Sequence, residues 1–327
     1  MRKSNLKLLS LGIFIILIQN PLVAADKNGN TDLGWFNSTT GKNNTIAGTL
    51  NRTKGDSNTI AGTLQRTIGN NNVVGGASNK TVGNSNNVLG TLQDTEGDNN
   101  TIAGISQVTK GNNNVIGGAS QTTTGNNNTI GGASNKTVGN SNNVLGTLQD
   151  TEGDNNTIAG ISQVTKGNNN TVGGASQTTT GNNNVIGGAT NKTIGDKNNI
   201  VGISNKTEGT SNKILGNTNS IIGDSNNIKG MSNTIEGNNN GVLGFDNITK
   251  GDKNLIGGLF NKTTGDNNWV AGIRNETAGK NNLVGGLRNG TLGNSNKVLG
   301  LDNATAGNSN WIAGLRNGTL GNSNKVL

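Results

Sequence analysis

The sequence predicts an all-β fold, a parallel β-solenoid (β-roll) with 14 residues per coil. Glycine recurs at every seventh position from Gly41 to Gly321 without a slip. Four residues before each glycine lies Asn or Gln, and between the two lies a column that alternates between Ile or Val and Thr. Two unlike heptads, xxNx(V/I)xG and xxNxTxG, therefore make one coil, and about 21 coils follow one another over residues 37–327.

The segment Asn-x-Val-x-Gly has a period of two, which is typical of a short strand with Asn, Val and Gly on its inner side. A coiled coil is excluded, because one Gly per heptad would cost roughly 1 kcal/mol each time and only one seam residue is apolar. We expect the inner side chains to stack on their copies in neighbouring coils, each Asn amide being satisfied by the copies above and below it. The inner positions include Asn100, Ile102 and Gly104, and two coils later Asn128, Ile130 and Gly132.

The N-terminal residues 1–25 have the pattern of a cleavable secretory signal peptide, with early basic residues, an apolar run over 8–18 and small residues at the end. A membrane anchor is the alternative, but the apolar run is shorter than the roughly 20 residues that span a bilayer. We expect residues 26–36 to form an N-terminal cap and the start of the repeats. The predicted location is secreted, either extracellular or periplasmic.

The segment Gly286–Leu299 returns word for word at Gly314–Leu327, and the first copy continues into Gly300. The printed chain therefore ends within a repeat, and we expect either a monomer or end-to-end association through an uncapped end. A longer duplication makes residues 76–114 identical to residues 132–170, a shift of four coils.

The composition excludes much enzyme chemistry. The chain has 54 Gly, 29% hydrophobic residues and no Cys, His or Tyr, so disulfides, zinc sites and His-activated nucleophiles cannot form. We expect no enzyme activity, no cofactor and no metal. Nucleic acid is a poor candidate partner, because basic and acidic residues alternate and aromatic residues make up only 2% of the chain.

The Asn column also allows a second interpretation. Asn-x-Thr at Asn51, Asn79 and Asn135 matches the N-glycosylation acceptor. The same Asn recurs at Asn100 and Asn128, where no Thr follows at that spacing, so an inward structural ladder accounts for both sets.

The two outward faces differ in charge. The Thr heptads carry charged pairs such as Arg52/Lys54 and Asp94/Glu96, whereas the outward pairs of the twelve Ile/Val heptads, from Thr45/Ala47 to Asn199/Val201, carry no charge. A flat, weakly polar strip of this size suggests a flat, extended partner, although small residues also simply suit a tight β-surface. Ice is one such partner, because outward residues about 4.8 Å apart between coils and about 6.7 Å apart along a strand form a regular grid. The residues expected to contact ice are Thr45, Ala47, Thr59, Ala61, Val73, Thr101, Ala103, Val115, Thr129, Thr157, Ala159, Thr171 and Val185.

The C-terminal third is less regular. Lys213, Lys229, Lys297 and Lys325 enter the uncharged face, together with two tryptophans at positions 269 and 311. We expect this part to contribute less to ice binding, and its tryptophans to be candidates for a glycan or protein contact.

The heptad xxNxVxG resembles that of the grass (ryegrass-type) ice-recrystallisation-inhibition, or antifreeze, β-roll proteins, over residues 30–327. The resemblance implies two heptads per coil, internal Asn ladders, and inhibition of ice recrystallisation through one flat face. It places the pairs Thr101/Ala103 and Thr129/Gly131 on that face, and the chain departs from the family by placing Thr inside every second heptad. A weaker similarity to the β-roll heads of trimeric autotransporter adhesins makes a bacterial surface adhesin or structural spacer the alternative function.

Overall fold

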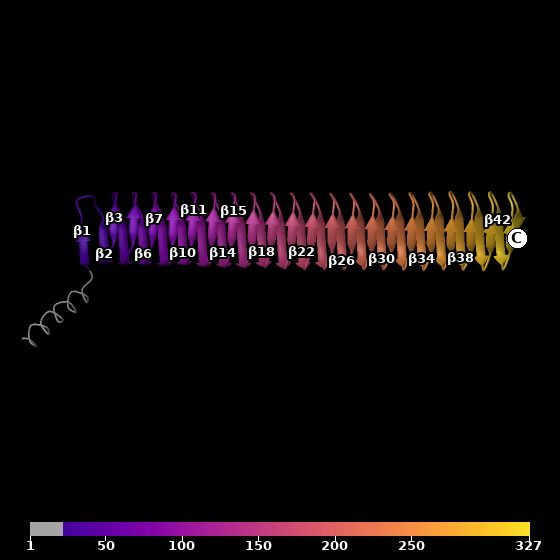
Figure 1. The fold of residues 1–327 in the computed structure, drawn as a ribbon, viewed down its shortest axis with the longest axis horizontal. Coiled ribbons are helices and arrows are strands. Elements are labelled where there is room, and N and C mark those ends of the chain that lie inside the picture. Colours follow the sequence, from indigo (N-terminus) through magenta and orange to yellow (C-terminus); the bar gives the residue numbers. More distant parts are fainter. Residues whose placement is uncertain (1–21) are drawn as a thin grey trace, which may run out of the picture. The chain divides into compact units, whose positions relative to one another are not determined.

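The structure is a computed structural model that describes residues 22–327. The chain separates into two compact units, the first ending at Leu148 and the second covering Gln149–Leu327. The described residues of each unit form a parallel β-solenoid of strands and turns, without a helix (Figure 1). Of the signal peptide predicted over residues 1–25, only the last four residues are described, and they form strand β1 (Leu22–Ala25).

Long and short strands alternate along the first unit. The long strands are β2 (Thr31–Trp35), β4 (Thr45–Thr49), β6 (Thr59–Thr63), β8 (Val73–Ala77), β10 (Asn87–Thr91), β12 (Thr101–Ile105), β14 (Val115–Ala119), β16 (Thr129–Ala133) and β18 (Asn143–Thr147). The short strands are β3 (Ser38–Thr40), β5 (Arg52–Lys54), β7 (Arg66–Ile68), β9 (Lys80–Val82), β11 (Asp94–Glu96), β13 (Val108–Lys110), β15 (Thr122–Thr124) and β17 (Lys136–Val138).

The second unit continues the same alternation. Its long strands are β20 (Thr157–Ile161), β22 (Thr171–Ala175), β24 (Val185–Ala189), β26 (Asn199–Ile203), β28 (Lys213–Asn217), β30 (Asn227–Met231), β32 (Gly241–Phe245), β34 (Leu255–Leu259), β36 (Trp269–Ile273), β38 (Leu283–Leu287), β40 (Lys297–Leu301), β42 (Trp311–Leu315) and the terminal β44 (Lys325–Val326). Its short strands are β19 (Asp150–Glu152), β21 (Val164–Lys166), β23 (Thr178–Thr180), β25 (Lys192–Ile194), β27 (Lys206–Glu208), β29 (Ser220–Ile222), β31 (Thr234–Glu236), β33 (Ile248–Lys250), β35 (Lys262–Thr264), β37 (Glu276–Ala278), β39 (Gly290–Leu292), β41 (Ala304–Ala306) and β43 (Gly318–Leu320).

Within each unit the long strands form one parallel sheet and the short strands form another. The register is one coil: Ile102 of β12 lies opposite Ile116 of β14, and Thr109 of β13 lies opposite Thr123 of β15. The predicted fold class, the 14-residue coil and the in-register stacking are confirmed.

The two strands of a coil differ in length, which the heptad pattern did not predict. Each long strand continues one residue beyond its glycine, whereas each short strand ends before its glycine. The corner after a short strand explains the difference, because the N–H of Asn112 donates to the side-chain Oδ1 of Asn126 at 2.8 Å, and similar bonds recur at neighbouring coils. A similar hydrogen bond forms at the end of the long strand β26, where the N–H of Ile203 donates to Asn217 Oδ1. The main-chain pairing of β26 with β28 ends there at Val201.

The inner columns are buried as predicted. Ile102 and Thr109 are 1% and 0% exposed, and their copies in neighbouring coils are equally enclosed. Each hydroxyl of the inner Thr column, such as Thr109 Oγ1 or Thr123 Oγ1, has no hydrogen-bond partner among the described residues. The Thr side chains therefore act as small, partly apolar spacers opposite Ile and Val.

The Asn ladder is confirmed, and it involves the main chain more than predicted. The side-chain Nδ2 of Asn100 donates to Asn86 Oδ1 at 3.0 Å and to the carbonyl oxygen of Gly111 at 2.8 Å. Its Oδ1 accepts from the main-chain N–H of Asn114 at 2.9 Å and from the Asn114 amide at 3.0 Å. Asn128 repeats the arrangement two coils further on, with the carbonyl of Gly139 as its main-chain acceptor. Each of these Asn amides thus joins three coils.

The corners require unusual backbone conformations. Gly104 has φ +145°, and a Cβ there would overlap the carbonyl oxygen of Gly118 in the next coil; Gly132 is in the same situation. Two residues after each glycine, a non-glycine residue adopts the left-handed conformation, for example Ser106 at φ 56° and Asn113 at φ 58°. This conformation returns at every seventh residue from Phe36 to Ser323.

The ladder begins in the segment predicted as an N-terminal cap. Asn30 occupies the first inner position, and its Nδ2 donates to Asp26 Oδ2 at 2.9 Å, in place of an Asn from a preceding coil. The main-chain N–H groups of Asn28 and Asn30 donate to Asp26 Oδ1. These hydrogen bonds, first of all the one from the Asn30 side chain, lower the pKa of Asp26. Strand β1 pairs antiparallel with β2 beside it.

Candidate functional site

The residues predicted to contact ice lie on the outer side of the long-strand sheets. In the first unit Thr45, Thr59, Ala61, Val73, Thr101, Ala103, Val115 and Thr129 are exposed and Ala47 is half-buried; in the second unit Thr157, Ala159, Thr171 and Val185 are exposed. Between them lie the buried inner residues, such as Ile102 between Thr101 and Ala103. The predicted alternation of inner and outer side chains therefore holds along this sheet.

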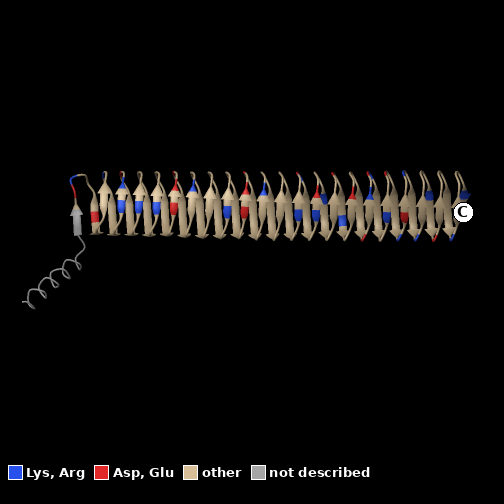
Figure 2. Ribbon diagram, in the orientation of Figure 1, with Lys and Arg blue, Asp and Glu red and all other residues tan. Residues whose placement is uncertain are grey.

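Strand pairing aligns these outer residues in straight columns. Thr101, Val115 and Thr129 face one another across β12, β14 and β16, and Ala103 and Gly117 form the adjacent column. Parallel strands place successive residues of a column about 4.8 Å apart, with about 6.7 Å between the two columns. The long strands β4–β26 carry no charged residue (Figure 2).

Leucines at two positions of this face fill gaps left by glycines. A Cβ on Gly75 would come within 2.9 Å of Leu89 Cδ2, and Gly131 has the same relation to Leu145. Gly117 and Gly187, by contrast, have open space where a Cβ would stand. The surface thus alternates between small residues and leucines that lean over their neighbours.

A third column of this surface was missed by the sequence analysis. The extra residue at the end of each long strand adds Thr49, Thr63, Thr91 and Thr147 in the first unit, with Ile105 and alanines between them. These residues pair in register like the other columns, for example Ile105 with Ala119. Their sequence signal is the residue directly after the glycine, which the heptad model assigned to a corner.

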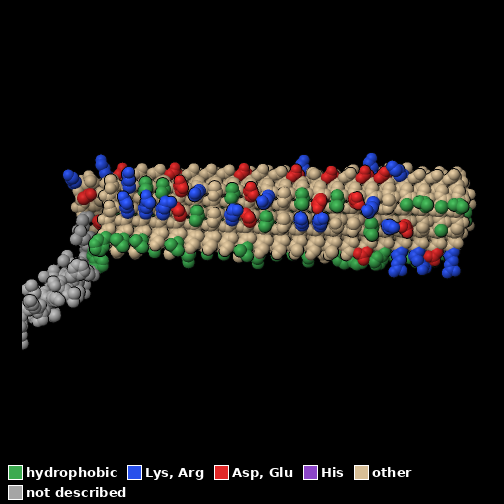
Figure 3. Space-filling view, viewed as in Figure 1, with side chains coloured by type: hydrophobic (Ala, Val, Ile, Leu, Met, Phe, Trp, Pro, Cys, Tyr) green, Lys and Arg blue, Asp and Glu red, His purple; other side chains and the backbone are tan. Residues whose placement is uncertain are grey.

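The short-strand sheet carries most of the charge of the first unit. Lysine, arginine and acidic side chains are distributed along its outer face (Figure 3). Some pair between neighbouring coils, such as Lys80 with Asp94 at 3.0 Å and, in the second unit, Lys262 with Glu276 at 2.7 Å. These pairs are well exposed, so each contributes at most about 1 kcal/mol. This face is an ordinary solvated surface, as predicted.

The solenoid residues whose pKa is shifted, Asp266 and Lys280, lie away from the long-strand face. The N–H of Asp252 and the ammonium group of Lys280 lower the pKa of Asp266, and that carboxylate raises the pKa of Lys280. Both residues belong to corners that follow short strands. We use long half-coil for a long strand together with the two residues that follow it. The long half-coils of β4–β26 are uncharged and contain no titratable side chain.

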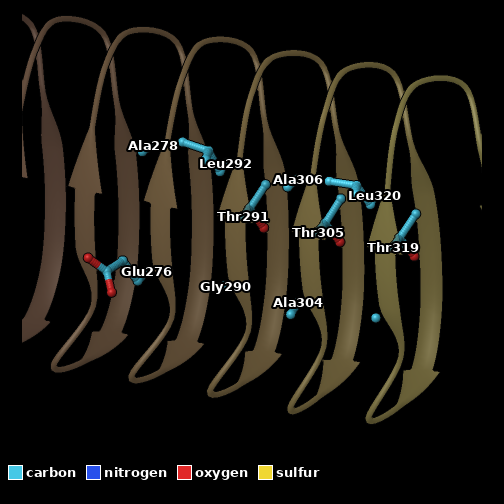
Figure 4. A pocket seen from close by; sticks show the side chains of 11 residues that line it. Glu276, Ala278, Gly290, Thr291, Leu292, Ala304, Thr305, Ala306, Thr319 and Leu320 are labelled. Carbon is cyan, nitrogen blue, oxygen red and sulfur yellow. The ribbon is translucent and has the colours of Figure 1, made fainter.

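A groove of about 580 Å³ lies on the short-strand sheet, between β37 and β43 (Figure 4). It exists because Gly290, Ala304 and Gly318 are small, while Leu292 and Leu320 form a wall. Its one carboxylate, Glu276, is paired with Lys262. The groove therefore lacks the convergent polar groups that catalysis requires.

Residues 22–327 contain no cluster of three or more acidic, His or Cys side chains able to hold a metal ion. Among the same residues, no helix is long and apolar enough to cross a membrane.

The possible N-glycosylation sites are enclosed in the fold. Asn51 and Asn79 are each 1% exposed, and their Nδ2 atoms donate to the carbonyl oxygens of Gly62 and Gly90, both at 3.0 Å. The amide nitrogen that would carry a glycan is thus part of the ladder in the folded chain.

No protein-family model matches the chain, and no curated protein matches its sequence.

Proposed function

We propose that the chain is a secreted ice-binding protein that adsorbs to ice through its long-strand face and inhibits ice growth and recrystallisation. The observation that carries this proposal is the absence of charge from every long half-coil between residues 45 and 205, combined with in-register columns of outer residues. It applies to the outer columns of β4–β18 in the first unit and of β20–β26 in the second.

The chemistry of these columns suits water more than a protein partner. Thr side chains combine a methyl group with a hydroxyl group, and the strands hold them at fixed spacings in two directions. A charged group would orient water around itself and disturb an ordered layer, whereas hydroxyl and methyl groups disturb it little. Each inner residue is locked by stacking and by the Asn ladder, so the outer groups are preorganised and little entropy is lost on adsorption.

The test is an ice-recrystallisation assay on the purified protein with two matched double variants. Thr101→Asp with Thr129→Asp places charges on the long-strand face, and Thr122→Asp with Thr124→Asp places them on the short-strand face. All four threonines are exposed and lie in the first unit. We expect the first pair to abolish inhibition and the second pair to leave it unchanged, with circular dichroism unaltered in both.

The opposite pattern would assign activity to the short-strand sheet. No inhibition by the folded unmodified protein would remove ice binding, and an adhesin or structural spacer would then be the better hypothesis.

A further inference from the structure

The long half-coils of β32–β44 expose large apolar side chains to solvent. Leu243, Leu255 and Trp269 are 63%, 53% and 56% exposed, and at the edge Leu315 is 67% exposed. Soluble proteins rarely leave so many large apolar groups together at the surface, and such patches mark interaction sites. We call this surface, the outer and edge residues of β32–β44 together with the residue that follows each long strand, the apolar-basic face.

Strand register gathers these groups into two lines. Leu255, Trp269 and Leu283 stand opposite one another across β34, β36 and β38. At the strand ends Leu259, Ile273 and three further leucines form a parallel line through β42. The apolar groups are therefore continuous along consecutive coils of the second unit.

Basic side chains accompany the two lines. The long half-coils from residue 241 onward contain five cations, Arg274, Arg288, Lys297, Arg316 and Lys325, and two acids, Asp246 and Asp302. The Arg288 guanidinium pairs with Asp302, with Nε at 2.8 Å from Oδ1. The ammonium groups of Lys297 and Lys325 lie 4.7 and 4.9 Å from the Trp311 ring centroid, one from each neighbouring coil. The face thus has a net positive charge beside its apolar groups.

We propose that the apolar-basic face binds the surface of an anionic lipid bilayer. Tryptophan is favoured at the boundary between headgroups and acyl chains, and lysine or arginine beside it attracts anionic headgroups. The main chain of these strands is hydrogen-bonded in register, so only side chains need to enter the interface. Because Lys297 lies beside the Trp311 ring, the positive charge and the aromatic ring would reach the same depth in the bilayer interface.

A second copy of the chain fits this face less well. A symmetric pair would bring two net-positive surfaces together, and like charges across an interface are unfavourable. A polysaccharide would use the rings and cations, but it would leave Leu243, Leu255 and Leu315 uncovered. Charge and apolar content together therefore favour lipid.

The test is co-sedimentation of the full chain with phosphatidylcholine vesicles that either contain or lack phosphatidylserine. We expect binding to the anionic vesicles only, weakening as salt is raised. Leu255→Ser, Trp269→Ser and Leu315→Ser combined should lower the partition coefficient at least about tenfold. Val73→Ser, Leu89→Ser and Val115→Ser, exposed apolar residues of the first unit, provide the control and should leave vesicle binding unchanged.

A charge series separates electrostatic from apolar contributions. Lys297→Glu, Arg316→Glu and Lys325→Glu combined should reduce binding to anionic vesicles about a hundredfold. Arg52→Glu, Lys54→Glu and Arg66→Glu, on the short-strand face, should not reduce it comparably. Equal losses in site and control variants would overturn the proposal, as would binding driven by the apolar run over residues 8–18, because every variant would then bind alike.

Sedimentation without lipid tests the competing occupant. A dimer that the Leu255, Trp269 and Leu315 substitutions dissociate would assign the face to a second copy and overturn the lipid proposal. The vesicle result is independent of ice recrystallisation, so either proposal can fail alone.

Discussion

Strands β12 and β36 have the same pattern of buried and exposed positions, and their surfaces differ where Thr101 of one corresponds to Trp269 of the other. Both are five residues long, with the same order of buried and exposed positions. Their inner residues are nearly the same, Asn100, Ile102 and Gly104 in one coil and Asn268, Val270 and Gly272 in the other. Their outer residues differ at one position, Thr101 against Trp269, while the outer alanines and the isoleucines at the edge are shared. The inner columns specify the coil, and the outer columns are free to acquire separate partners.

The largest expected effect comes from breaking what the two regions share. Asn100→Ala and Asn268→Ala each remove a side chain that makes hydrogen bonds to neighbouring coils on both sides. Buried groups would be left unsatisfied, so we expect each to destabilise its unit by about 2–4 kcal/mol. Urea unfolding followed by circular dichroism measures this loss.

The outer residues of the same coils are the controls. Thr101→Ala and Trp269→Ala should change stability by less than about 0.5 kcal/mol. A loss as large as that of the Asn variants would contradict the division between structural inner columns and free outer columns.

The inner Thr column offers a stabilising change. Thr123 Oγ1 is buried without a hydrogen-bond partner, and the same column holds Ile221 and Ile235 in the second unit. Thr123→Val keeps the shape and removes the unsatisfied hydroxyl, so we expect a gain of about 1 kcal/mol in the free energy of unfolding. Thr122→Val, on the outer side of the same strand, should leave thermal stability nearly unchanged; a loss at Thr123 would reveal a partner for its hydroxyl.

A smaller effect is expected from completing the outer grid. Gly117 and Gly187 have free space for a side chain in extended backbone. Replacing both with Thr adds hydroxyl groups worth up to about 1 kcal/mol each, so inhibition of recrystallisation should need about two- to fivefold less protein. Gly290→Thr, in equally open space on the short-strand sheet, is the control, and a similar gain there would argue against a single active face.

The smallest expected effect is that of pH on ice binding. The uncharged half-coils contain no titratable group, so recrystallisation inhibition should stay constant between about pH 5 and pH 9. Asp266 provides the contrast in stability. Its folded-state pKa is lowered, so its ionised form stabilises the fold above the unfolded pKa, and this contribution is lost as pH falls through the folded value. A titration of ice activity near neutral pH would contradict the proposed face.

The sequence predicted the fold to the level of the coil, because inner Asn, Ile and Gly residues recur without interruption and each has a physical reason to do so. It missed the difference between long and short strands. That difference depends on whether an Asn or Asp directly after the glycine captures an N–H from the neighbouring coil, as Asn126 does, and a heptad consensus treats this position as a free corner.

The candidate site was predicted for its first two columns and not for its edge. The pairs such as Thr101 and Ala103 follow from alternation alone, whereas the Thr49 column requires knowledge of where the strand ends. The apolar-basic face was seen only as scattered tryptophans and lysines, because register must be known before Leu255, Trp269 and Leu283 become one line.

The inequality of the two strands within a coil also constrains how the gene can change. Insertion of 14 residues, or of the four coils by which the identical segments 76–114 and 132–170 are displaced, lengthens both faces and leaves every column intact. Insertion of a single heptad would move all later long half-coils into short-strand positions. The outer residues of the later coils would then lie on the opposite sheet from those of the earlier coils. Recombination between misaligned copies therefore preserves both faces only when it adds or removes whole coils. The length of each face, and with it the area available to a partner, changes in steps of one coil.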